Sequence, residues 1–208
     1  MSAYRCLFPV RYEGNIVFHD TPLSSIFLTR VLATLSEIAY IYVFASVLRA
    51  LNTGAAGWVD ALSWLMVAQV VVSQGLVWGA VLTGRLALYF YEELGWLVIF
   101  AANTVASLYL SWDPGVPAAK VILLKWNLVF GALYVPWQLF HLRTLSANAA
   151  KRGRGATLSA GLERSLKART RRTDAEAWGG WIGVSWMTGY WAVLIPPWVY
   201  GVAKVLAA

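Results

Sequence analysis

The residues best suited to chemistry are ionisable side chains that lie inside long apolar stretches. Glu37 lies in the first such stretch, Glu92 in the third and His141 at the end of the fourth. A charge at the centre of a membrane-spanning helix costs roughly 2.5–3.5 kcal/mol on insertion scales. Such a group must be protonated, paired or next to a water-filled cavity. These three residues therefore mark a candidate polar site within a bilayer.

Helical spacing predicts the direction in which these side chains point. In the fourth stretch, small or polar residues recur every three or four positions on one helix face, at Asn127, Gly131, Tyr134, Gln138 and His141. Glu92 and Asn103 share a face of the third stretch, and Glu37 shares one with Arg30 in the first. If these faces meet, they form an inward-facing pocket. The alternative is that these polar residues only form hydrogen bonds between neighbouring helices. The candidate ligand- or ion-binding residues are Glu37, Glu92, Asn103, Asn127, Gln138 and His141.

Metal and cofactor chemistry find little support in the sequence. Cys6 is the one cysteine, so no thiolate cluster can form, and His19 and His141 are the two histidines. Glu37, Glu92 and His141 could supply three ligands, but the second Glu-x-x-His element of a carboxylate metal site is missing. Patterns of an activated nucleophile or a glycine-rich phosphate loop are also missing. We expect no metal and no cofactor, and the sequence leans away from an enzyme.

The composition is typical of a membrane protein. Of 208 residues, 59% are hydrophobic and 13% are charged, whereas soluble domains are about half apolar and a quarter charged. The 12 Trp and 10 Tyr suit membrane interfaces. The formal net charge of +7 lies mostly in one loop, so we expect membrane headgroups and no nucleic acid as its partner.

Turn signals divide the chain into apolar runs long enough to cross a bilayer as helices. Asp20-Thr21-Pro22 predicts the start of the first helix, and Gly84 a left-handed cap after the second. Pro136 and Pro196-Pro197 predict kinks. We predict an all-α, polytopic integral membrane protein: one membrane domain with about five spans, at 31–49, 61–82, 86–110, 118–142 and 178–204.

Lysine and arginine predict the orientation of these spans. With the N-terminus inside, 13 Lys and Arg residues fall on the inner side and 3 on the outer side. Because basic loops stay on the cytoplasmic side, we predict that the N-terminus and the 143–177 loop face the cytoplasm, or the matrix or stroma of an organelle.

The 143–177 loop combines leucines at helical spacing with basic residues. Leu158, Leu162 and Leu166 recur every four residues, which predicts an amphipathic helix over 157–172 lying on the inner leaflet. A solvated loop and a docking site for an acidic protein are the alternatives. The predicted membrane-surface residues are Arg164, Lys167, Arg169, Arg171 and Arg172.

The last span carries small residues at close-packing spacing. Such residues let helices approach closely, within one chain or between subunits. They predict contacts in a homo- or hetero-oligomer through Gly179, Gly183, Ser185 and Gly189.

Three functions are compatible with these patterns. The first is a non-catalytic protein whose acidic pocket binds or transports a proton, a cation or a small amphipathic ligand. The second is a structural subunit of a larger membrane complex, and the third is a lipid-modifying enzyme that uses Glu37, Glu92 and His141. A mutant with neutralised glutamates separates the first two, since only the first should lose function while assembly stays intact.

Overall fold

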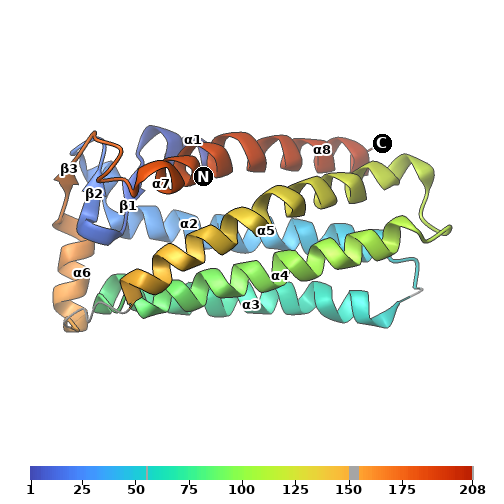
Figure 1. Ribbon diagram of the computed structural model, residues 1–208, viewed down its shortest axis with the longest axis horizontal. Coiled ribbons are helices and arrows are strands. Elements are labelled where there is room, and N and C mark those ends of the chain that lie inside the picture. The colour runs from blue at the N-terminus through green and yellow to red at the C-terminus, as the bar shows by residue number, and fades with distance from the viewer. Residues whose placement is uncertain (55, 150–154, 208) are drawn as a thin grey trace.

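Four long helices lie side by side in the computed structural model, which describes residues 1–54, 56–149 and 155–207. They are α2 (Ile26–Leu51), α3 (Gly57–Thr83), α4 (Ala87–Ser111) and α5 (Val121–Ala149); Figure 1 shows them as one bundle. Each is long and apolar enough to cross a membrane. The predicted all-α membrane-protein class is therefore confirmed.

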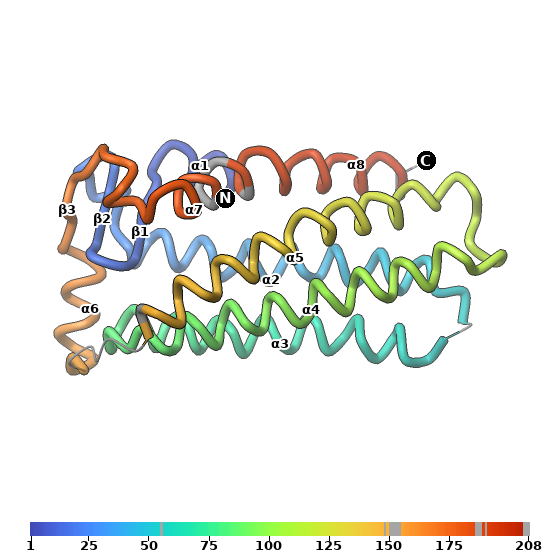
Figure 2. Tube along the Cα trace, in the orientation of Figure 1, coloured from blue at the N-terminus to red at the C-terminus, as the bar shows by residue number. Residues whose placement is uncertain are grey.

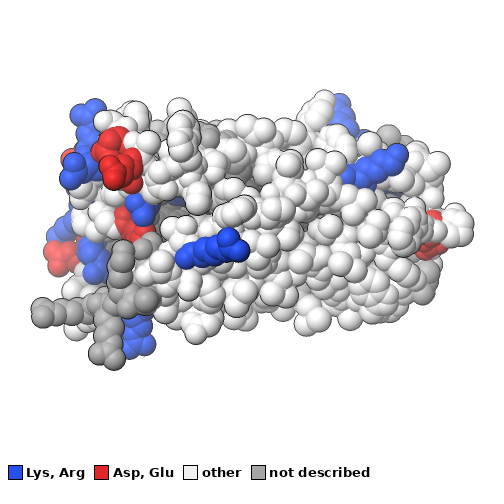
Figure 3. Space-filling model, in the orientation of Figure 1, with Lys and Arg blue, Asp and Glu red and all other residues white. Residues whose placement is uncertain are grey.

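The outer surface of the bundle is apolar along its length. Large apolar side chains on all four helices are more than half exposed, among them Leu35, Leu65, Val105 and Leu133. On the face drawn in Figure 3, most charged side chains lie near the ends and the long middle is mostly uncharged. Soluble monomers rarely expose apolar patches of this extent, whereas lipid is a suitable environment for them.

Short turns make α3 and α4 antiparallel neighbours, as predicted. Gly84 has a φ of 72°, in the left-handed region, and its N–H donates to Ala80 O at 2.8 Å. Only glycine adopts this conformation without a steric cost from Cβ. The predicted C-terminal cap of this helix is confirmed.

The start of the first long helix differs from the prediction. Thr21 and Pro22 begin a short 3-10 turn, Pro22–Ser24, and Ser25 is then extended. The α-helix begins at Ile26, and Ser25 Oγ accepts a hydrogen bond from Leu28 N at 3.3 Å. Proline is suited to the first position of either helix type, so the sequence signal marked the start of the 3-10 turn and not the start of the α-helix.

The fourth long helix also differs from its predicted limits. A 3-10 turn, Ala118–Lys120, precedes α5, which begins at Val121. The helix then continues through Pro136 and past residue 142 to Ala149. Polar residues at its end extend it beyond the apolar run that predicted it.

The C-terminal segment is one continuous helical stretch made of three parts. α7 (Gly180–Ser185) is followed by a π-helical part (Trp186–Leu194) and by α8 (Ile195–Ala207), and α8 packs on α5. The π-helical winding ends just before Pro196-Pro197, which lie in the first turn of α8. The prolines therefore mark a change of helix type. The apolar part, Trp191–Val205, is shorter than the four long helices.

The N-terminal residues fold into a cap of short elements at one end of the bundle. α1 (Ser2–Leu7) is followed by strands β1 (Val10–Arg11) and β2 (Ile16–Val17), joined through a 3-10 turn (Glu13–Asn15) with positive φ at Gly14 and Asn15. β2 also pairs in parallel with β3 (Thr170–Arg171). We call the end of the bundle that carries these strands the hairpin end.

The remaining helix, α6 (Leu158–Lys167), runs across the hairpin end, as Figures 1 and 2 show. It packs against α3 and α2. Thr157 caps it by accepting a hydrogen bond from Ala160 N at 3.4 Å. The predicted helix over 157–172 is thus present but ends at Lys167, because Thr170 and Arg171 pair with β2 instead.

Gly161 should be needed for the docking of α6. A Cβ at this position would lie 1.7 Å from the backbone oxygen of Leu82. Alanine normally favours a helix by about 1 kcal/mol over glycine, but here the overlap with backbone should outweigh this gain. We expect Gly161→Ala to weaken docking by about 1–3 kcal/mol, measured as faster hydrogen exchange of the α6 amides. Gly155→Ala, where no atom lies within 4 Å of the added Cβ, is the matched control. Equal exchange in the two variants would contradict the prediction.

Candidate functional site

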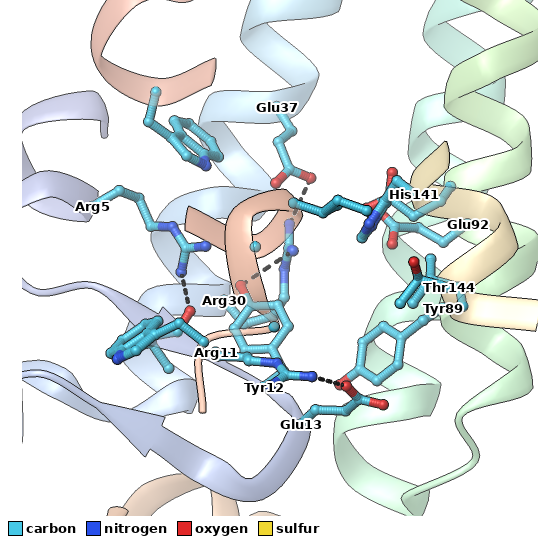
Figure 4. Close-up of a pocket in the computed structure, with 18 residues that line it drawn as sticks. Arg5, Arg11, Tyr12, Glu13, Arg30, Glu37, Tyr89, Glu92, His141 and Thr144 are labelled. Carbon is cyan, nitrogen blue, oxygen red and sulfur yellow. Dashed lines mark hydrogen bonds and ion pairs between the residues drawn. The ribbon is translucent and has the colours of Figure 1, made fainter. Parts of the chain in front are cut away.

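A cavity of about 160 Å³ lies at the hairpin end. Its walls come from α2, α4, α5, the N-terminal hairpin and residues 178–183. Figure 4 shows Glu37, Glu92 and His141 around it, each on a different helix. The structure therefore brings together three of the six candidate residues. The other charged or aromatic residues of the wall are Arg5, Arg11, Tyr12, Glu13, Arg30, Tyr89, Glu93, Trp178 and Trp191.

Glu37 is buried, and one of its carboxylate oxygens has two partners. Its Oε2 lies 2.6 Å from Arg30 Nη2 and accepts a hydrogen bond from Gln74 Nε2 at 3.0 Å. Arg30 Nη2 also donates to Gln74 Oε1 at 2.8 Å. The side chain points into the bundle, as we predicted. Its direct partners, Arg30 and Gln74, come from α2 and α3 and not from the polar faces of α4 and α5 that the predicted pocket would have placed beside it.

Gln138 and His141 both lie next to Glu93. Gln138 Nε2 donates to the backbone O and to Oε2 of Glu93, at 2.9 and 2.6 Å, and His141 Nε2 lies 3.7 Å from Glu93 Oε1. Glu93 is not among the residues that the sequence analysis proposed for the pocket. The structure buries it, so Glu93 is a residue of the site that the sequence did not mark out.

Glu92 is an acidic residue of the cavity that forms no ion pair among the described residues. One carboxylate oxygen accepts a hydrogen bond from Trp96 Nε1 at 3.0 Å, within α4. No Lys, Arg or His of the described chain forms an ion pair with it. The side chain is 6% exposed and lines the cavity. A carboxylate in this position attracts a cation or a proton.

The arginines of the cavity are already engaged. Arg5 donates to Val10 O at 3.1 Å, and its guanidinium carbon lies 5.7 Å from the Tyr12 ring and 5.6 Å from the Trp191 ring. Burial lowers the pKa of the Arg5 guanidinium. Arg11 Nη2 lies 2.5 Å from Glu13 Oε2, and its Nη1 donates to Ala177 O. These N-terminal residues were not predicted for the site; the turn Glu13-Gly14-Asn15 was the one local signal that could have placed them.

Asn103 and Asn127 lie outside the cavity wall. Asn127 Nδ2 donates to Ser107 Oγ at 3.1 Å, and Asn127 Oδ1 accepts from Trp198 Nε1 at 2.9 Å. Eleven residues separate Asn127 from Gln138, which is about 16 Å along a helix. Asn103 is fully buried, and its side-chain atoms form no hydrogen bond within the described residues. Both asparagines therefore lie outside this cavity, and a part for them in ligand binding stays a prediction.

The small residues predicted for subunit contacts are largely used inside the chain. Gly179 and Gly183 line the cavity, and a Cβ on Gly183 would lie 1.7 Å from Trp178 O. Ser185 Oγ accepts a hydrogen bond from Trp137 Nε1 at 3.0 Å. Gly189 has no atom within 4 Å of an added Cβ. Oligomer formation through this face stays a prediction.

In the described part of the chain, His, Cys, Asp and Glu form no group of three or more placed to hold a metal ion. The three-ligand arrangement of Glu37, Glu92 and His141 is therefore not formed. What the cavity offers is a carboxylate without a cationic partner beside aromatic rings. Comparison of the chain with protein-family models, curated proteins and solved structures finds no match.

Proposed function

We propose that this chain is a non-catalytic multi-pass membrane protein that binds a small amphipathic cation at the hairpin end of its bundle. The observation that carries the proposal is Glu92, a buried carboxylate that lines a cavity without a cationic partner from the described residues. A ligand cation would supply the missing charge. Binding sites commonly combine an apolar wall with a few polar groups that orient the ligand.

The charges of the wall favour a cation over an anion. Arg30 is compensated by Glu37 and Arg11 by Glu13. An anion would have to compete with these carboxylates for the guanidinium groups of Arg30 and Arg11. A cation would meet Glu92 directly, since no side-chain cation from the described chain is paired with it.

The aromatic residues favour an organic cation over a proton or a metal ion. Tyr12 and Tyr89 stack with ring centroids 6.2 Å apart, and Trp178 and Trp191 complete the aromatic part of the wall. The Tyr12 and Trp191 rings already lie near the Arg5 guanidinium. What the aromatic wall offers a ligand is therefore mainly a surface on which an apolar body packs. A proton or an inorganic cation would use Glu92 but not these rings.

Three small probes of equal length test the proposal: n-butylammonium, n-butanol and butyrate. We expect only the ammonium ion to raise the thermal unfolding midpoint of the purified protein. At a ligand concentration of a hundred times Kd, binding raises the free energy of unfolding by about 2.7 kcal/mol. Glu92→Gln, which keeps the shape and removes the charge, should abolish the effect, while Glu163→Gln on the exposed surface of α6 should not. Equal stabilisation by butanol, or an unchanged response in Glu92→Gln, would overturn the proposal.

We also propose a topology for the cavity within the membrane. The charge asymmetry of the sequence puts the hairpin end on the cytoplasmic side, or on the matrix or stromal side of an organelle. The continuous stretch from Gly180 to Ala207 would form the fifth span. Cysteines introduced at Glu176 and at Asp113, in a Cys6→Ser background, should label from opposite sides of sealed vesicles.

A further inference from the structure

The leucines of α6 form an exposed stripe. Leu158, Leu162 and Leu166 are 65%, 42% and 43% exposed, although α6 is docked on the bundle. The docked side is formed by Gly161 and Ser165, both buried. Successive helix residues are about 100° apart, so the leucine stripe lies beside the docked side. An apolar stripe of this kind is costly in water.

The position of α6 matches the level at which a membrane surface should lie. Its Arg164 Nη2 donates to Val81 O at 2.9 Å, and Gly161 packs on Leu82, both in the last turn of α3. A helix of 27 residues is about 40 Å long, whereas the hydrocarbon core is about 30 Å thick. The end of α3 therefore reaches the headgroup layer, and α6 runs across the bundle axis there (Figures 1 and 2).

The charges around the stripe are mostly basic. Residues 158–172 contain five basic residues and one acidic residue, Glu163. Lys167 pairs with Glu163 at 3.1 Å and Arg169 with Asp20 at 2.8 Å. Arg171 and Arg172 are exposed and form no ion pair with a described carboxylate. Headgroups that bear a negative charge complement this surface.

We propose that α6 is an interfacial anchor that inserts its leucines into one leaflet and binds anionic lipid headgroups through Arg171 and Arg172. The exposed leucine stripe is thus covered by the surface of the surrounding bilayer. This proposal concerns a surface separate from the cavity and holds whether or not the cavity binds a cation.

The test uses the full chain in vesicles, in a Cys6→Ser background. A fluorophore is attached at Leu162→Cys in the stripe or at Glu163→Cys on the polar side of α6. We expect a quencher carried on lipid acyl chains to act at least fivefold more strongly on the label at 162 than on the label at 163, and aqueous iodide to show the opposite order. Equal quenching at the two sites would overturn the insertion of the stripe, and so would a label at 162 that iodide reaches freely, as expected for a docking site of an acidic protein.

Lipid composition tests the headgroup part of the proposal. Vesicles of phosphatidylcholine alone are compared with vesicles that contain a third of phosphatidylglycerol. We expect the anionic lipid to lower iodide quenching at 162 at least twofold, and the double variant Arg171→Gln/Arg172→Gln to remove this difference. The same response in the double variant and in the parent chain would overturn the role of the two arginines.

Discussion

Replacing Arg30 by methionine is expected to lower the free energy of unfolding by about 3–5 kcal/mol, because Glu37 would stay buried without its cationic partner. The 2.6 Å contact joins side chains that are 3% and 11% exposed, so little water is available to solvate the remaining carboxylate. Gln74 would still donate to Glu37 but carries no charge. The reverse variant, Glu37→Met, should cost a similar amount. Reversible unfolding in mixed micelles measures both losses.

The double variant Arg30→Met/Glu37→Met should recover most of the loss, since it removes both charges and fills the space with apolar atoms. Arg49→Met, on the same helix, is the control. Arg49 donates to Ser63 and lies over the Trp64 ring, without a described carboxylate as its ion-pair partner, so we expect a loss of only about 1 kcal/mol. A double variant as unstable as the sum of the two single variants would show that the two charges do not depend on each other.

Phe44→Ala is expected to destabilise the bundle by about 3–5 kcal/mol. The Phe44 ring is fully buried and stacks on Trp198 with a centroid distance of 3.5 Å. It also lies 5.2 Å from the Phe100 ring and 5.2 Å from the Phe130 ring. In a membrane, association of helices depends on packing more than on removal of apolar surface from water. The cavity left by the ring should therefore account for most of the loss.

Leu35→Ala is the matched control for Phe44→Ala, because Leu35 lies on the same helix and is 67% exposed to the surroundings of the bundle. We expect it to change the stability by about 0.5 kcal/mol or less. Thermal unfolding in one detergent compares the two variants. Similar losses in both would mean that Phe44 does not contribute through its packing.

Hydrophobicity averaged over the length of a whole helix predicted the fold well. Each long helix follows from about twenty apolar residues, and a signal summed over that length tolerates single exceptions such as Glu37 in α2. Gly84 was predictable because the left-handed cap depends on one residue type alone. The starts of α2 and α5 were not predictable. Ser25 and Val121 follow 3-10 turns, and local residue preferences do not distinguish such a turn from the first turn of an α-helix.

The candidate site was predicted only in part, and that part followed from helical phase. Helical phase identifies which side of a helix a residue lies on, and this placed Glu37, Glu92 and His141 around one cavity. It does not identify which polar residues lie at one depth, so Asn127 was grouped with Gln138 although about 16 Å of helix separates them. Arg5 and Tyr12 were missed because the six-residue helix α1 and the two-residue strand β1, which ends just before Tyr12, are too short to show a period.

The parallel pairing of β2 with β3 joins two segments that are synthesised at widely separated times. Ile16 pairs with Thr170, and the 154 positions between them take roughly 8–30 s to synthesise at 5–20 residues per second. The hairpin that carries Arg11 and Tyr12 to the cavity therefore emerges first but reaches its final neighbours last. During that interval the long helices can assemble while the cavity lacks the wall that β3 holds in place. The polar residues of α2, α4 and α5 would then be open to water from the hairpin end until the last part of the chain arrives.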